Sequence, residues 1–260
     1  MAERAAAFFD LDRTLVEGSS GIHFVRAAYE AGLLSRRRLA ADLLANLRFR
    51  LRGSTDAEAE QVRERVGRMI AGVPVRSLQR LSHRVLAGVL PNIFPEMLRA
   101  AHEHQDAGRP VFICTAASQE MADLMAHVLG FDGAVGSRSE VSGGLYTGRA
   151  AGPFAYGEGK ATLIRELAGA EGLDLGASYA YSDSSSDLPM LRAVGHPVVV
   201  NPDAELLRVA REQSWPVMHV DRLRRRIRLA GGAAVLAGVG ATAGVLVVSR
   251  RPDGIAWRLL

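Results

Sequence analysis

The sequence predicts an α/β fold in which a parallel sheet carries helices on both faces and a helical segment follows the first strand. Two observations lead to this prediction. Short apolar runs, each long enough for a buried strand, alternate with segments of helical periodicity. That alternation stops between Glu17 and about Leu90, where helical patterns continue without a convincing strand. With 260 residues, 48% of them hydrophobic, the chain can bury a core of the required size.

The elements follow in a regular order along the chain. The predicted strands are Ala5–Asp10, Val111–Ala116, Ser178–Ser182, Val198–Asn201 and Val217–Val220. The predicted helices between them are Pro95–Ala107, Gln119–Leu129, Gly159–Ala168 and Ala204–Gln213. Val135–Gly148, with Ser-Gly-Gly in its middle, predicts a β-hairpin. Strands separated by helices of this length favour parallel pairing.

The segment 17–90 is predicted to be a helical cap inserted over the sheet. Leu39, Leu43, Leu44 and Leu47 recur at helical spacing, with arginines nearby. We therefore expect three parts: an α/β core formed by residues 1–16 and 91–221, the cap at 17–90, and a C-terminal tail at 222–260.

Charge is distributed unevenly over these parts. The cap carries 13 Arg against 7 acidic residues, and the tail carries 8 Arg against Asp253 alone, which leaves −9 for the remainder of a +4 chain. Such basic segments suit anionic partners, either a phospholipid surface or an anionic substrate. A single cysteine, Cys114, excludes an intramolecular disulfide and fits a reducing compartment. The N-terminus does not have the pattern of a signal peptide.

Residues 229–248 of the tail are 20 consecutive uncharged residues, which is the length of a membrane span. Gly240 and Gly244 have the small-xxx-small spacing of helices packed in lipid. A buried C-terminal helix or an unstructured Ala/Gly tail are the alternatives. If the segment spans a membrane, the arginines before it predict a cytoplasmic catalytic domain.

Acidic residues follow two of the predicted strands. Asp10 and Asp12 lie at the end of the first strand, and Asp183 and Asp187 follow Ser178–Ser182. The carboxyl ends of parallel strands meet at one sheet edge, where α/β folds bind ligands. Carboxylates this close to one another favour a bound Mg²⁺.

Two further residues at strand or helix ends suit a phosphate. Thr115 ends an apolar strand just before a helix, where its hydroxyl and the following N–H groups can hold phosphate oxygens. The alternative is an ordinary helix cap by Thr115 or Ser118. Lys160, the only lysine, opens a helix, where the helix dipole disfavours a cation unless an anion lies nearby. An ordinary surface lysine is the alternative.

Taken together, Asp10-x-Asp12-x-Thr14, Thr115, Lys160 and Asp183 with Asp187 resemble the four motifs of the haloacid dehalogenase (HAD) superfamily. The resemblance is to its subfamily IB, the phosphoserine-phosphatase-like (SerB-like) branch, and covers residues 5 to about 220. It implies a Rossmann-like core and an α-helical C1 cap, and it implies phosphoric monoester hydrolase activity with Mg²⁺.

The resemblance also implies roles for the residues. Asp10 would attack phosphorus and form an aspartyl-phosphate, and Asp12 would act as general acid and then as general base. Thr115 and Lys160 would bind the phosphate oxygens. The metal ligands would be Asp10, the main-chain carbonyl of Asp12, and Asp183. Thr14 and Asp187 would support the site, Asp187 by orienting Lys160 or a metal-bound water.

The sequence departs from the phosphoserine phosphatases at two motifs. Thr115-Ala116-Ala117 replaces their Ser-Gly-Gly, and Ser182-Asp183-Ser184 replaces Gly-Asp-Gly. The prediction is therefore a phosphatase for a lipid or lysolipid phosphate, with phosphoserine as the alternative. A membrane-associated regulatory module with little turnover is the alternative of another class. Neither nucleic acid nor an obligate protein partner is expected, and no zinc site is expected at His102 and His104.

Overall fold

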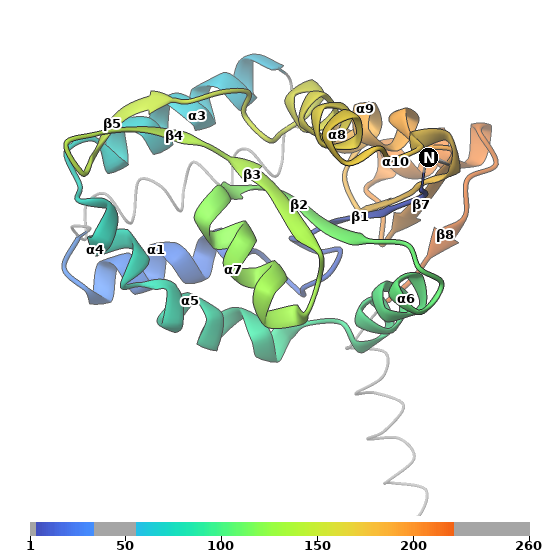
Figure 1. Ribbon diagram of the computed structural model, residues 1–260, viewed down its shortest axis with the longest axis horizontal. Helices are drawn as coiled ribbons and strands as arrows, with labels where there is room; N and C mark the ends of the chain where they lie inside the picture. Colours follow the sequence, from blue (N-terminus) through green and yellow to red (C-terminus); the bar gives the residue numbers. More distant parts are fainter. Residues whose placement is uncertain (1–3, 34–55, 221–260) are drawn as a thin grey trace, which may run out of the picture. The chain divides into compact units, whose positions relative to one another are not determined.

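The computed structural model describes residues 4–33 and 56–220, which belong to one compact unit, Met1–Val220. Its centre is a parallel sheet of six strands in the order β3-β2-β1-β6-β7-β8 (Figure 1). The strands are β1 (Ala7–Asp10), β2 (Val111–Ser118), β3 (Gly133–Ser137), β6 (Tyr179–Ser182), β7 (His196–Val200) and β8 (Val217–Met218). The predicted α/β class is confirmed.

Alternation along β1 supplies both faces of the sheet with core side chains. Ala7 and Phe9 pack on one face, which is covered by α6 (Pro95–Asp106) and α7 (Gln119–Leu129). Phe8 packs on the other face, which is covered by α8 (Glu158–Glu171), α9 (Leu188–Ala193) and α10 (Ala204–Glu212). Each buried phenylalanine stabilises the fold by about 1.5–3 kcal/mol. The central strand is therefore held from two sides.

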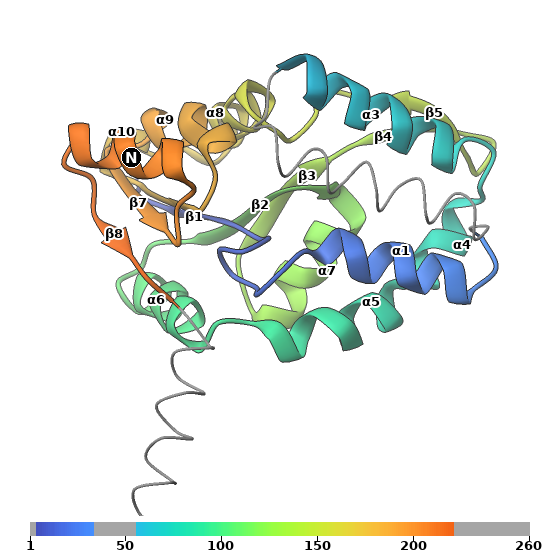
Figure 2. The same ribbon diagram turned by 180° about the vertical axis from the view of Figure 1, so that it is seen from behind.

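The elements between β1 and α6, which we call the cap, are helical wherever the structure describes them. They are α1 (Ser20–Glu30), α3 (Asp56–Ile70), α4 (Val75–Gln79), α5 (Ser82–Val89) and the 3-10 turn Leu90–Asn92. Helices α1 and α5 lie side by side (Figure 2). The two chain segments that lead into and out of the cap are also paired, because the N–H of Glu17 donates to Asn92 O (2.7 Å) and that of Phe94 to Leu15 O (2.9 Å).

The hairpin after β3 differs from the prediction in its position. It consists of β4 (Ser139–Ser142) and β5 (Leu145–Ala150), whereas Val135 belongs to β3 of the main sheet. The turn falls at Gly143 and Gly144, whose φ angles of 57° and 78° suit glycine. The hairpin starts later than predicted because the preceding residues first pair with β2. A glycine-rich run of five residues gives little sequence signal for a separate parallel strand.

The hairpin is attached to the cap through the backbone. Gly72 N donates to Tyr146 O (2.8 Å) and Tyr146 N to Val73 O (3.1 Å). Helix α3 also packs closely on β5, since a Cβ added at Gly67 would lie 2.2 Å from Gly148 O. The hairpin therefore supports the cap from the side of the core.

Several predictions concern residues outside the described ranges. The candidate membrane segment 229–248, the tail as a whole and Arg36 to Arg52 of the cap all lie there. Within residues 4–33 and 56–220, no helix is long and apolar enough to cross a membrane.

Candidate active site

Asp10 lies at the carboxyl end of β1, in the middle of the sheet. Its neighbour in register on β2 is Cys114, so Thr115 follows one residue beyond, and β6 ends at Ser182 on the other side. Asp10 continues the sheet face of Ala6 and Phe8, the face that α8 covers. The three strand ends therefore meet at one edge, with the first turn of α8 beside them.

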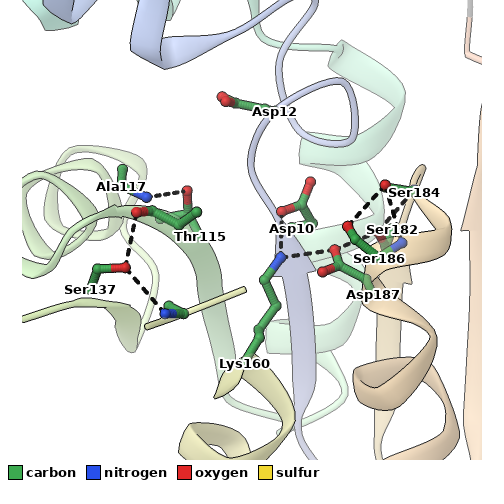
Figure 3. A network of polar contacts seen from close by, with 12 residues as sticks. Asp10, Asp12, Thr115, Ala117, Ser137, Lys160, Ser182, Ser184, Ser186 and Asp187 are labelled. Atoms are coloured by element: carbon green, nitrogen blue, oxygen red, sulfur yellow. Dashed lines mark hydrogen bonds and ion pairs between the residues drawn. The ribbon is translucent and has the colours of Figure 1, made fainter. Parts of the chain in front are cut away.

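Lys160 in that first turn joins two carboxylates. Its Nζ donates to Asp10 Oδ1 and to Asp187 Oδ2, both at 2.8 Å (Figure 3). The lysine is only 3% exposed, and its cost at a helix N-terminus is offset by these two anions. The hydroxyl of Ser182 donates to the same Asp187 Oδ2 at 2.7 Å. Lys160 is thus a buried residue of the site, and the interpretation as a surface lysine is wrong.

Burial and charge shift the pKa values of these groups. Burial raises the pKa of Asp10 to about 7, against the opposing effect of Lys160. Burial and the neighbouring Asp10 raise the pKa of Asp183 to about 8, while Arg13 opposes this shift. Burial alone would lower the pKa of Lys160, but Asp10 and Asp187 outweigh it and hold that pKa above its ordinary value. The lysine therefore stays charged over the whole pH range in which the carboxyls ionise.

The loop that carries Asp183 and Asp187 is fixed by Asp203. Asp203 N donates to Asp183 O (2.9 Å), and Asp203 Oδ2 accepts from Ser185 N (2.7 Å). Asp203 also caps α10, since its Oδ1 accepts from Leu206 N (2.8 Å). The loop geometry is therefore anchored to a helix of the core.

The residues at this edge fit a divalent cation. Two buried carboxylate oxygens, Asp183 Oδ2 and Asp187 Oδ1, accept no hydrogen bond. Asp183 Oδ2 instead forms an ion pair with Arg13 Nη2 at 2.5 Å. With Asp10 included, three carboxylates face only two cationic side chains, so an added cation improves the charge balance.

No cluster of three His, Cys, Asp or Glu side chains suited to a metal is found within residues 4–33 and 56–220. The predicted ligand set is smaller than such a cluster, and it stays a prediction. The set needs only two carboxylates, those of Asp10 and Asp183, because its third ligand is the main-chain carbonyl of Asp12. Hard oxygen ligands of this kind suit Mg²⁺.

Thr115 lies across the strand edge from Lys160 (Figure 3). Its Oγ1 accepts the N–H of Ala117 at 3.2 Å, so its own proton is available to a further acceptor. Ser118, the residue directly before α7, caps the helix by accepting a hydrogen bond from Met121 N. The capping role therefore belongs to Ser118 and not to Thr115. Thr14 is fully buried, and its Oγ1 has no hydrogen-bond partner.

Asp12 follows the strand in a tight turn and lies above Asp10 (Figure 3). Its two oxygens accept hydrogen bonds from the first residues of α1: Oδ2 from Ser19 Oγ (3.0 Å) and Oδ1 from Ser20 N (2.7 Å). The structure therefore brings the predicted site residues to one edge of the sheet, with Asp12 on the cap side.

Sequence reasoning missed four residues of this arrangement: Arg13, Ser19, Ser182 and Asp203. Asp203 had a readable signal, since an aspartate directly before a helical pattern is a favoured N-cap. The contacts of the other three join segments through space, and local sequence patterns do not report such contacts.

Comparison with known proteins identifies a matching family model and several similar chains. The family model for haloacid dehalogenase-like hydrolases matches residues 7–192. A probable phosphatase of Mycobacterium tuberculosis is 39% identical over 261 residues, which cover 99% of this chain and 89% of that protein. The phosphoserine phosphatase SerB1 of the same species is 36% identical, over 95% of this chain and 81% of that protein. A crystal structure of a Bordetella pertussis protein of unknown function superposes with a TM-score of 0.73 and 27% identity, covering 84% of this chain and 99% of that one.

Proposed function

The chain belongs to the haloacid dehalogenase-like hydrolase family, and from this premise we propose that it is a Mg²⁺-dependent phosphatase acting through Asp10. The observation that carries the proposal is the position of Asp10, which ends the central strand with Lys160 on one oxygen. A relative that is 39% identical is a probable phosphatase, which supports the same reaction class.

The positions of the side chains support the following reaction. Asp10 attacks phosphorus, the bond from phosphorus to the ester oxygen breaks, and Asp12 gives a proton to the leaving oxygen. Water then attacks the aspartyl-phosphate and gives its proton to Asp12, while the bond from phosphorus to Asp10 breaks. Lys160 and the Thr115 hydroxyl hold the phosphoryl oxygens during both steps.

A bound Mg²⁺ would be held by Asp10, Asp183 and the carbonyl of Asp12. It would supply positive charge that neutralises the phosphoryl group. Asp187 contributes differently, because its contact with Lys160 Nζ directs the ammonium towards Asp10.

We propose a small-molecule phosphate monoester as the substrate, with phosphoserine as the first candidate. The relationship to SerB1 supports this choice. The preference for a lipid or lysolipid phosphate depended on the arginine-rich cap and tail. The tail and part of the cap lie outside the described residues. That preference stays a prediction, as does membrane association.

The decisive experiment compares wild type with Asp10→Asn on p-nitrophenyl phosphate in Mg²⁺. We expect a loss on the order of 1,000-fold or more, because the nucleophile of the covalent route is removed. Asp106→Asn, an equal change at an exposed position on α6, is the matched control and should keep full activity. Full activity in Asp10→Asn would refute the proposal.

A panel of phosphoserine, phosphatidylglycerophosphate and lysophosphatidate then identifies the substrate class. Turnover of phosphoserine with none on the lipids supports the first candidate, and the reverse result supports the lipid prediction. A chain that hydrolyses no phosphate ester at enzymatic rates would instead fit the regulatory module.

A further inference from the structure

The carboxylate of Asp12 is held by the first residues of the cap helix α1. The hydroxyl of Ser19 donates to Oδ2 at 3.0 Å, and the main-chain N–H of Ser20 donates to Oδ1 at 2.7 Å. A serine at the N-cap usually accepts an N–H of its own helix. Ser19 occupies the N-cap of α1 but makes no such capping bond. Its hydroxyl is directed at Asp12 instead.

The backbone on both sides of this contact is fixed. Leu11 O accepts the N–H groups of Leu15 and Val16, both at 3.0 Å, which closes the turn that carries Asp12. Glu17 N is bonded to Asn92 O at the base of the cap, only two residues before Ser19. The start of α1 is therefore anchored next to the site. This anchoring fixes the position of the Ser19 hydroxyl relative to the carboxylate of Asp12.

We infer that Ser19 is a positioning residue, which aims the carboxyl of Asp12 at the oxygen that leaves phosphorus. This inference rests on the proposed function, in which Asp12 transfers protons. According to this inference, a residue at the start of the cap helix α1 sets the direction of proton transfer by Asp12.

The two donors also distinguish the two oxygens of Asp12. The N–H of Ser20 can only donate, so Oδ1 keeps that hydrogen bond throughout. The Ser19 hydroxyl can donate to one lone pair of Oδ2 while that oxygen carries its proton in another direction, so the contact can persist in both protonation states and leaves the proton directed at the leaving oxygen. In the first step the Oδ2–H bond breaks as the leaving oxygen gains the proton. In the second step Oδ2 takes a proton from the attacking water.

A purely structural role for Ser19 makes a different prediction. If its hydroxyl only stabilised the start of α1, its loss would lower the melting temperature and affect all substrates alike. Loss of positioning affects most the substrates whose leaving group needs a proton. An alkoxide needs that proton far more than a p-nitrophenolate, so two substrates separate the two roles.

The experiment measures kcat/KM for p-nitrophenyl phosphate and for β-glycerophosphate, an alkyl phosphate, in Mg²⁺. kcat/KM reports phosphoryl transfer from substrate, whereas hydrolysis of the aspartyl-phosphate is common to both substrates. In Ser19→Ala we expect kcat/KM to fall about 10-fold on the alkyl ester and at most about 2-fold on the aryl ester. The larger loss is smaller than the whole contribution of general acid catalysis, because Asp12 itself is still present. Ser19→Thr keeps the hydroxyl and should restore the ratio.

Two further variants control for unfolding and for the general effect of removing a hydroxyl from the cap. Ser19→Gly also lacks the hydroxyl, but glycine is tolerated at an N-cap much better than alanine, so it covers the case in which Ser19→Ala unfolds. Ser82→Ala removes a hydroxyl at the start of α5 in the same cap and should leave the ratio unchanged.

Equal losses on both substrates in Ser19→Ala and Ser19→Gly would overturn the inference, as would failure of Ser19→Thr to restore the ratio. The proposed function is tested separately by Asp10→Asn. An inactive Asp10→Asn with an unchanged ratio in the Ser19 variants overturns only the role of Ser19. An active Asp10→Asn overturns the function itself.

Discussion

The sheet side of the site is held by buried ion pairs, whereas the cap is joined to the β4–β5 hairpin by main-chain hydrogen bonds and close backbone packing. On the sheet side, Lys160 binds Asp10 and Asp187 with almost no exposure to solvent. On the cap side, α3 and the β4–β5 hairpin meet through main-chain groups and two close glycines, Gly67 and Gly148. Removing one partner of a buried ion pair is far more costly than loosening a neutral contact. The sheet side should therefore tolerate very little change, and the cap side considerably more.

The largest effect is expected from Lys160→Met, which removes the ammonium but keeps a side chain of similar length. The buried carboxylates of Asp10 and Asp187 then lose their shared partner, and we expect a loss of about 3–5 kcal/mol in the free energy of unfolding. Urea denaturation at neutral pH measures it. Activity should fall more than about 100-fold, because a charge that stabilises the transition state is lost. A stable and active Lys160→Met would remove the contrast between the two sides.

The pH dependence of stability is expected to be the next largest effect. Asp10 and Asp183 have folded-state pKa values raised to about 7 and about 8. A raised carboxyl pKa contributes stability that is complete below the ordinary value, near 3.8, and is lost as the pH rises through the folded value. In the absence of Mg²⁺, the free energy of unfolding should therefore fall as the pH rises from 4 to 8.

Two controls accompany this titration. The proposed Mg²⁺ would stabilise the ionised carboxylates and should flatten the profile at the alkaline end. Asp183→Asn removes one of the two titrating groups and should reduce the slope without Mg²⁺. A profile that rises between pH 4 and pH 8 would contradict the assigned pKa shifts.

On the cap side, Gly67→Ala is expected to have an intermediate effect. The added Cβ would meet Gly148 O at 2.2 Å, which forces α3 and β5 apart. We expect about 1–3 kcal/mol of destabilisation, typical of overpacking, and a rise in KM that exceeds any fall in kcat. Gly169→Ala is the matched control, because that helical glycine has open space around its Cα and alanine favours the helix. Equal stabilisation by both changes would show that the close contact does not matter.

The smallest effect is expected from Tyr146→Phe. The tyrosine hydroxyl donates to Glu120 Oε1 at 3.3 Å, a long hydrogen bond between β5 and α7. Its removal should lower the free energy of unfolding by less than about 1 kcal/mol and leave kcat nearly unchanged. Thermal unfolding and steady-state rates measure both quantities. A loss as large as that of Lys160→Met would mean that side chains, rather than the backbone, hold the hairpin to the core.

Much of the fold was readable from the sequence because it depends on local patterns. The apolar run that became β1 and the helical spacing that became α7 are signals within one segment. The strand β3 was not predicted, since its five residues are rich in small side chains and become a strand only by pairing with β2.

The candidate site shows the same limit. Asp10, Lys160 and Asp183 could be found because their motifs occur at strand or helix ends. The contact of Ser182 with Asp187 could not be inferred, although serine in place of glycine had marked that position. Ser19 could be read only as a helix cap, since the direction of its hydroxyl depends on a turn seven residues earlier in the chain.

The pairing of Asp10 with Lys160 has a consequence for the order of events during synthesis. These partners are separated by 150 residues, and the loop with Asp187 depends in turn on Asp203. A chain growing from its N-terminus therefore exposes Asp10 long before its partners have been made. Contacts of such long range also form slowly. The nascent protein thus has no assembled site until β6 and the start of α10 have been added, and catalytic activity begins only when the core is nearly complete.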